Sequence, residues 1–135
     1  MATMFPVEVM TPEGAAFEGE VEMVSTRTTV GSIGIRANHQ PLMAMLNPTE
    51  LRLYVGGDEI RRFAQGEGYL QMAGNHALLL VEDAIPVEEL DLDELTDKLA
   101  EAEARLESAE DGTAAYERAE RDVERWTTYR DIATS

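Results

Sequence analysis

The 135-residue chain contains no cysteine, which excludes a disulfide framework and thiolate metal sites. Aromatic residues make up only 6% of it, so a packed core must come from aliphatic side chains and seven methionines. No apolar run approaches the roughly 20 residues that span a bilayer, and no signal peptide is recognisable. We therefore expect a soluble protein, which can still belong to a complex at a membrane.

Basic residues are also scarce, because 11 Lys and Arg stand against 27 Asp and Glu, for a net charge of −16. Nucleic-acid binding needs a basic face, and an anionic lipid surface repels an acidic chain. The balance therefore argues against nucleic acid and against direct lipid insertion. We expect protein partners, which the chain contacts through local patches.

The patterns of common active sites are missing as well. The histidines, His39 and His76, fall in separate expected loops and form no H-x-x-x-H pair. The chain has neither a P-loop nor a G-x-S-x-G elbow. Most carboxylates lie on expected helices as a solvated surface. The sequence thus predicts no catalytic residue, no metal and no cofactor.

Residues 1–86 have the pattern of β-structure. Apolar and polar residues alternate over 5–10, 20–23 and 51–55, and turn residues such as those at 11–14 and 73–76 separate the runs. Many short strands at this spacing are typical of a sandwich or barrel. We expect an all-β sandwich of about ten short strands, ending at Pro86.

Residues 87–135 change abruptly to Ala, Glu, Leu and Arg. Leucines and alanines recur at spacings of three and four, which indicates one helical face. Asp91 is placed to cap a first helix, with Glu94 as the other half of a capping box. A turn at Asp111–Gly112 leads to a second helix from about Thr113. The fold class is therefore α+β, with a carboxyl-terminal antiparallel two-helix hairpin.

The stretch from Gly31 to Leu46 combines a glycine-flanked β-prone segment, a polar loop closed by Pro41 and an apolar run. Proline stiffens such a loop, and a rigid polar tip on a buried strand often carries function. From the residues alone, a plain inter-strand loop is the simpler interpretation.

The pattern G-x-I-G-I-x-x-x-H-x-P-L in this stretch resembles the signature of the epsilon subunit of F-type rotary ATP synthases. Residues 63–72 and 78–84 resemble later segments of that family, and a helical tail follows them in the same order. The resemblance covers nearly the whole chain.

This resemblance implies a non-catalytic rotor subunit of the central stalk. Its expected partners are the gamma subunit, the c-ring and the alpha/beta catalytic hexamer. Its sandwich would help couple proton or sodium translocation to ATP synthesis. Its hairpin would be mobile, and its extended placement would restrain ATP hydrolysis. The expected location is the cytoplasmic face of a bacterial membrane, with the plastid thylakoid as the alternative.

Site residues follow from the same resemblance. The expected interface with the c-ring and gamma comprises Ser32, Ile33, His39, Gln40 and Leu42. The expected regulatory contacts with beta and gamma come from the second helix, at Arg118, Arg121, Arg125 and Arg130. For any single arginine, a solvated helix face is the simpler interpretation.

Some bacterial members of the family bind ATP at the start of the first helix, and Asp91 matches the aspartate of that motif. Glu94 and Leu95 replace its arginine and alanine, and the acids of this turn would repel a phosphate. We therefore expect Asp91 to act as a helix cap and leave it as a weak nucleotide candidate.

Two other functions are compatible with the sequence. One is a free-standing adaptor that uses the hairpin as a docking module, and the other is a small enzyme with a site at His39 and a carboxylate. Stoichiometric co-purification with gamma distinguishes the rotor subunit from the adaptor.

Overall fold

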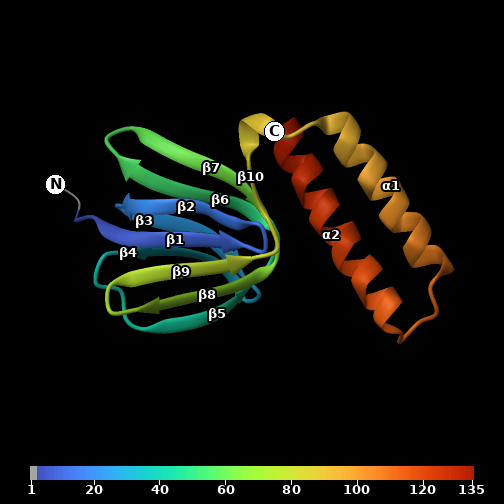
Figure 1. Cartoon of the computed structure of the whole chain (residues 1–135), viewed down its shortest axis with the longest axis horizontal. Coiled ribbons are helices and arrows are strands. Elements are labelled where there is room, and N and C mark those ends of the chain that lie inside the picture. Colours follow the sequence, from blue (N-terminus) through green and yellow to red (C-terminus); the bar gives the residue numbers. More distant parts are fainter. Residues whose placement is uncertain (1–2) are drawn as a thin grey trace. The chain divides into compact units, whose positions relative to one another are not determined.

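The structure, a computed structural model, describes residues 3–135 and confirms a ten-stranded β-sandwich followed by a pair of helices (Figure 1). The chain divides into two compact units between Val87 and Glu88, one residue after the expected boundary. A short 3-10 helix, η1 (Val87–Glu89), lies at this division. No helix in the described part of the chain combines the length and apolar character needed to cross a bilayer.

The first unit contains all the strands: β1 (Phe5–Thr11), β2 (Gly14–Val21), β3 (Met23–Thr28), β4 (Gly31–Arg36), β5 (Leu42–Leu46), β6 (Thr49–Gly56), β7 (Glu59–Gln65), β8 (Gly68–Ala73), β9 (His76–Val81) and β10 (Ala84–Pro86). They pair in the order β10-β7-β6-β3-β5-β8-β9-β1-β2, and β4 pairs with β3. Only one residue pair, Thr28 with Leu46, joins β3 to β5. This narrow link separates two layers, β2-β1-β9-β8-β5 and β10-β7-β6-β3-β4.

The core between the layers is aliphatic, as the composition predicts. Successive side chains of a strand point to opposite faces, so every second residue enters the core. On β1 these are Phe5, Val7 and Val9, all fully buried. The other layer contributes residues such as Leu51 and Leu53 from β6.

One polar group is fully buried among these side chains. The carboxamide of Gln65 accepts a hydrogen bond from the Thr26 hydroxyl, at 2.5 Å. It also donates to the backbone carbonyls of Asn47 and Gly66, at 3.1 and 3.0 Å. This network satisfies the buried amide and fastens β3, β7 and the β5–β6 connection together.

The second unit consists of α1 (Leu92–Ser108) and α2 (Ala114–Thr134). Asp91 caps α1 as expected, because its Oδ1 accepts from the backbone N–H groups of Asp93 and Glu94. The first helix ends at Ser108, about one turn before the expected position, and Gly112 in the connection has a positive φ of 84°. Thr113 caps the second helix.

Polar contacts cross the seam between the two helices. Asp122 of α2 accepts from Arg105 of α1 at 3.1 Å and from Arg125 of its own helix at 2.9 Å. The Trp126 ring lies under two cations, with Lys98 Nζ 4.8 Å and Arg125 Cζ 4.6 Å from its centroid. The hairpin is therefore fastened by charge and cation–π contacts as well as by its buried leucines and alanines.

Candidate protein-docking face

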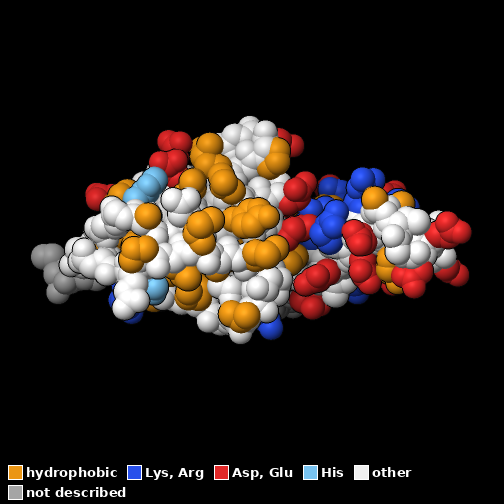
Figure 2. Space-filling view, turned by 90° about the horizontal axis from the view of Figure 1, so that it is seen from below, with side chains coloured by type: hydrophobic (Ala, Val, Ile, Leu, Met, Phe, Trp, Pro, Cys, Tyr) orange, Lys and Arg blue, Asp and Glu red, His pale blue; other side chains and the backbone are white. Residues whose placement is uncertain are grey.

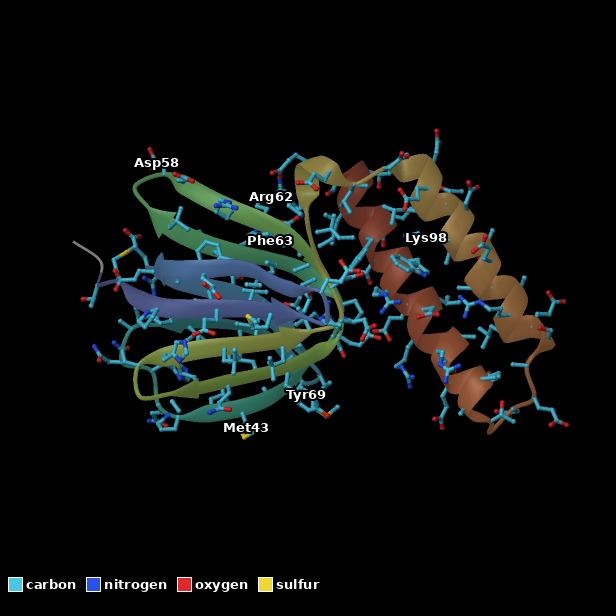
Figure 3. All side chains as sticks on the ribbon, viewed as in Figure 1. Met43, Asp58, Arg62, Phe63, Tyr69 and Lys98 are labelled. Atoms are coloured by element: carbon cyan, nitrogen blue, oxygen red, sulfur yellow. The ribbon has the colours of Figure 1, made fainter. Side chains whose placement is uncertain are left out.

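Large apolar side chains gather on the outer face of the layer that contains β5, β8 and β9. The exposed fractions are 74% for Met43, 56% for Met45, 55% for Tyr69 and 49% for Leu80. Figure 2 shows hydrophobic side chains grouped on this side of the sandwich. Met43 and Tyr69 project from the same edge of it in Figure 3.

Strand register brings these side chains together. Met45 lies opposite Tyr69, which lies opposite Leu80, so one row crosses three strands. In the next row Met43 lies opposite Gln71, which lies opposite Leu78. We call this set the apolar face: Met43, Met45, Tyr69, Gln71, Leu78 and Leu80. Five of these residues, all except Met45, line a shallow hollow of about 270 Å³.

The local sequence explains why the face is apolar. The runs Leu42–Leu46 and Ala77–Val81 are apolar at every position, whereas a strand of a two-layer sandwich buries only one side. Alternate residues of these runs, such as Leu46 and Leu79, fill the core, and their neighbours are left outside. Contiguous exposed apolar surface of this kind marks a protein interaction site. Exposed methionines suit such a site because their flexible thioethers adapt to a partner.

The outer face of the second layer has a different character. Arg52 and Arg62 lie opposite each other on β6 and β7, and both bind the carboxylate of Glu50. The distances are 2.6 Å from Arg52 and 2.8 Å from Arg62. These bonds lower the pKa of the Glu50 carboxyl from 4.5 to about 2, and the bond from Arg62 has the largest effect. This part of the second layer is therefore charged, whereas the outer face of the first layer is apolar.

The residues expected at an interface from the sequence fall at two places. Ser32 and Ile33 lie near the start of β4, whereas His39 and Gln40 lie in the loop after its end. At about 3.3 Å per residue, Ser32 and His39 are separated by roughly the length of the strand. Leu42 opens β5 and packs partly against the core, as Ile33 does. These residues are therefore not one cluster, and only the loop at His39 lies at the end of the sandwich where the β8–β9 turn is.

That loop is held by hydrogen bonds. The backbone N–H of His39 donates to the carbonyl of Arg36 at 3.3 Å, which closes a turn. The ring Nδ1 of His39 donates to the carbonyl of Gln40 at 2.8 Å. Because a carbonyl can only accept, Nδ1 is the donor in this contact, and Nε2 is left for a partner.

The arginines of α2 divide into two groups. Arg118, Arg121 and Arg130 are exposed, whereas Arg125 is only 9% exposed and is bound to Asp122 and Trp126. Asp91, the weak nucleotide candidate, uses its carboxylate to cap α1. Among residues 3–135 no three His, Asp or Glu side chains are grouped as metal ligands.

No docking face was predicted from the sequence at the apolar runs 42–46 and 77–81. The signal was available in the sequence, because a sandwich strand that is apolar on both sides must expose one of those sides.

Comparisons with known proteins agree on one family. The profile described as "ATP synthase, Delta/Epsilon chain, beta-sandwich domain" matches residues 4–87. The ATP synthase epsilon chain of Persephonella marina is 38% identical over 107 residues, which are 79% of each chain. That of Halalkalibacterium halodurans is 32% identical over 94% of this chain and 95% of its own.

A solved structure has the same fold. A chain in the cryo-EM structure of the Euglena gracilis mitochondrial ATP synthase, which includes OSCP, F1 and the c-ring, superposes with a TM-score of 0.79. It is 20% identical, and the match covers 97% of this chain and 82% of the other.

Proposed function

The chain belongs to the ATP synthase epsilon-chain family, and from this premise we propose that it works as the central-stalk rotor subunit of an F-type ATP synthase. It performs no chemistry itself. Its sandwich joins the gamma subunit to the c-ring, so that proton or sodium translocation is coupled to ATP synthesis in the alpha/beta hexamer. Its site is peripheral, on the cytoplasmic face of a bacterial membrane.

The observation that carries this proposal is the apolar face. A rotor subunit must be held firmly enough to transmit torque, and apolar burial is the main source of such attachment. Burying exposed apolar area contributes roughly 25 cal/mol per Å². We assign the apolar face, bordered by His39 and Gln40, to gamma. The opposite end of β4, at Ser32 and Ile33, is then available to the c-ring.

We further propose that the hairpin restrains ATP hydrolysis. The exposed cations Arg118, Arg121 and Arg130 are suited to an acidic surface of a catalytic beta subunit. The helices are stabilised locally, for example by the Glu94–Lys98 pair at 3.0 Å, so they persist when their surroundings change. Such an element can take two placements without unfolding.

The experiment that tests the proposal uses co-purification. Met43→Asp and Tyr69→Asp place a carboxylate on the apolar face, and Arg27→Asp places one at an exposed position of the other layer. Met43→Asp and Tyr69→Asp should lose stoichiometric association with an assembly of alpha, beta and gamma chains, while Arg27→Asp should retain it. Retention by all three variants contradicts docking through the apolar face. A native chain that never associates with gamma favours the adaptor instead.

A further inference from the structure

Two connections meet beside the apolar face, at the end of the sandwich where β4 finishes. The backbone N–H of Asn38, in the β4–β5 loop, donates to the side-chain Oδ1 of Asn75, in the β8–β9 turn, at 2.6 Å. The residues are 37 positions apart in the sequence, so this bond is a tertiary contact between the β8–β9 hairpin and the loop that connects the two layers.

Asparagine suits both positions for a backbone reason. Asn38 and Asn75 have positive φ values of 63° and 59°, and asparagine tolerates this left-handed conformation better than most residues. Gly74 before Asn75 also has a positive φ, of 57°. Positive φ at both residues is typical of a type I′ turn, which joins the two strands of a tight β-hairpin. The pairing of Ala73 with His76 closes that turn.

Asn75 is therefore part of the same rigid hairpin as four of the six residues of the apolar face. Strands β8 and β9, which it joins, carry Tyr69, Gln71, Leu78 and Leu80. Its side chain reaches across to the loop that precedes Met43. Leu42 at the start of β5 lies opposite Met72, one residue before the β8 end, so the loop enters the sheet beside this turn.

We propose that Asn75 is a positioning residue, whose carboxamide fixes the β4–β5 loop so that His39 and Gln40 continue the apolar face as one docking surface for a single protein partner. This inference rests on the proposed function, which makes the partner gamma. The partner needs apolar side chains for the face and a polar group for His39 Nε2. The contact that Asn75 makes is with the backbone of Asn38, so it acts through the loop and not by touching the partner.

The expected effect follows from preorganisation. If the loop adopts its binding arrangement only part of the time, the apparent affinity falls by that fraction. One net hydrogen bond contributes roughly 1 kcal/mol. If the Asn38–Asn75 bond alone holds the loop in its binding arrangement, its loss lowers the fraction of molecules in that arrangement about five-fold. Stability of the sandwich should change little, because the core is untouched.

The test measures binding of the full chain to a gamma-containing F1 assembly from which the epsilon chain has been removed. Asn75→Gly keeps the left-handed φ and removes the acceptor, whereas Asn75→Asp keeps both. We expect Asn75→Gly to bind about five-fold more weakly with a thermal midpoint close to native, and Asn75→Asp to bind like the native chain. Arg27→Asp, at an exposed position of the other layer, controls for the added negative charge.

A double-mutant cycle makes the role specific. His39→Ala should weaken binding in the native chain and have a smaller effect in the Asn75→Gly background, because both changes remove the same arrangement. Native affinity of Asn75→Gly, equal weakening by Asn75→Asp, or full additivity with His39→Ala would each overturn the inference. A loss of docking by Met43→Asp in the same assay shows that the proposed function survives such a failure.

Discussion

Tyr69 and Leu80 lie directly opposite each other on β8 and β9, and both side chains are about half exposed, at 55% and 49%. Leu79, the neighbour of Leu80 in the chain, is fully buried. A single strand therefore carries leucines with opposite environments at adjacent positions.

This contrast predicts a matched pair of variants. Leu79→Ala opens a cavity in the core and should lower the free energy of unfolding by about 2–5 kcal/mol. Leu80→Ala should lower it less, by about 1 kcal/mol at most, because half of its side chain is already exposed to solvent. Urea denaturation of the two full-length variants measures both values. A large loss for Leu80→Ala would mean that the chain itself depends on the apolar face.

The buried Gln65 network predicts a second effect. Gln65→Leu removes the carboxamide that pairs with Thr26, Asn47 and Gly66. Because each buried group left unpaired costs about 1–3 kcal/mol, we expect a destabilisation of at least about 2 kcal/mol. Thr26→Val is the companion variant, and the double variant should lose less than the sum of the two. Strict additivity in denaturation experiments would show that the network is not cooperative.

Glu50 predicts a specific acid sensitivity. The pKa of its carboxylate is lowered from 4.5 to about 2 by Arg62 and Arg52. The unfolded chain therefore binds this proton more readily than the folded chain. The stabilisation is complete above about pH 4.5, and it is lost as the pH falls from there toward 2.

Glu50→Gln removes this titration. Other carboxylates also titrate in this range, so the informative quantity is the difference in unfolding free energy between the native chain and the variant. That difference should be constant above pH 5 and shrink between about pH 4.5 and 2. If the difference does not vary with pH, the pKa of Glu50 is the same in the folded and unfolded chains, and the two arginines do not lower it.

The sequence was sufficient to predict the architecture, because local patterns determine it. Two-residue alternation predicts the strands, and three- and four-residue spacing predicts the helices. Asp91 could be placed as a cap because capping depends on residues three positions away. The helix α1 ends at Ser108, before the turn expected at Asp111–Gly112, so the connection to Thr113 is longer than predicted.

The candidate site was predicted less completely, because it depends on contacts between distant segments. The hydrogen bond between Asn38 and Asn75 joins the β4–β5 loop to the β8–β9 turn, two segments that no local pattern relates. The burial of Arg125 needs Asp122 and Trp126 at particular positions of its own helix. By contrast, the separation of Ser32 from His39 was available from strand geometry alone.

The different environments of the α2 arginines predict that they have separate roles. Replacing Arg118, Arg121 and Arg130 with Ala removes exposed cations, so the fold of the hairpin should be retained while restraint of ATP hydrolysis weakens. Exposed ion pairs contribute roughly 0.5 kcal/mol each, so three correspond to about a ten-fold weaker inhibited arrangement.

Arg125→Ala should instead loosen the hairpin, because its guanidinium lies on Trp126 and binds Asp122. Trp126 is the only tryptophan, so its fluorescence in the isolated chain reports that loosening directly. The expected pattern is a changed hydrolysis rate with native emission for the triple variant, and altered emission for Arg125→Ala. Unchanged restraint in the triple variant would show that these three cations do not hold the hairpin against a partner. Native emission and thermal stability in Arg125→Ala would show that Arg125 is not part of the seam.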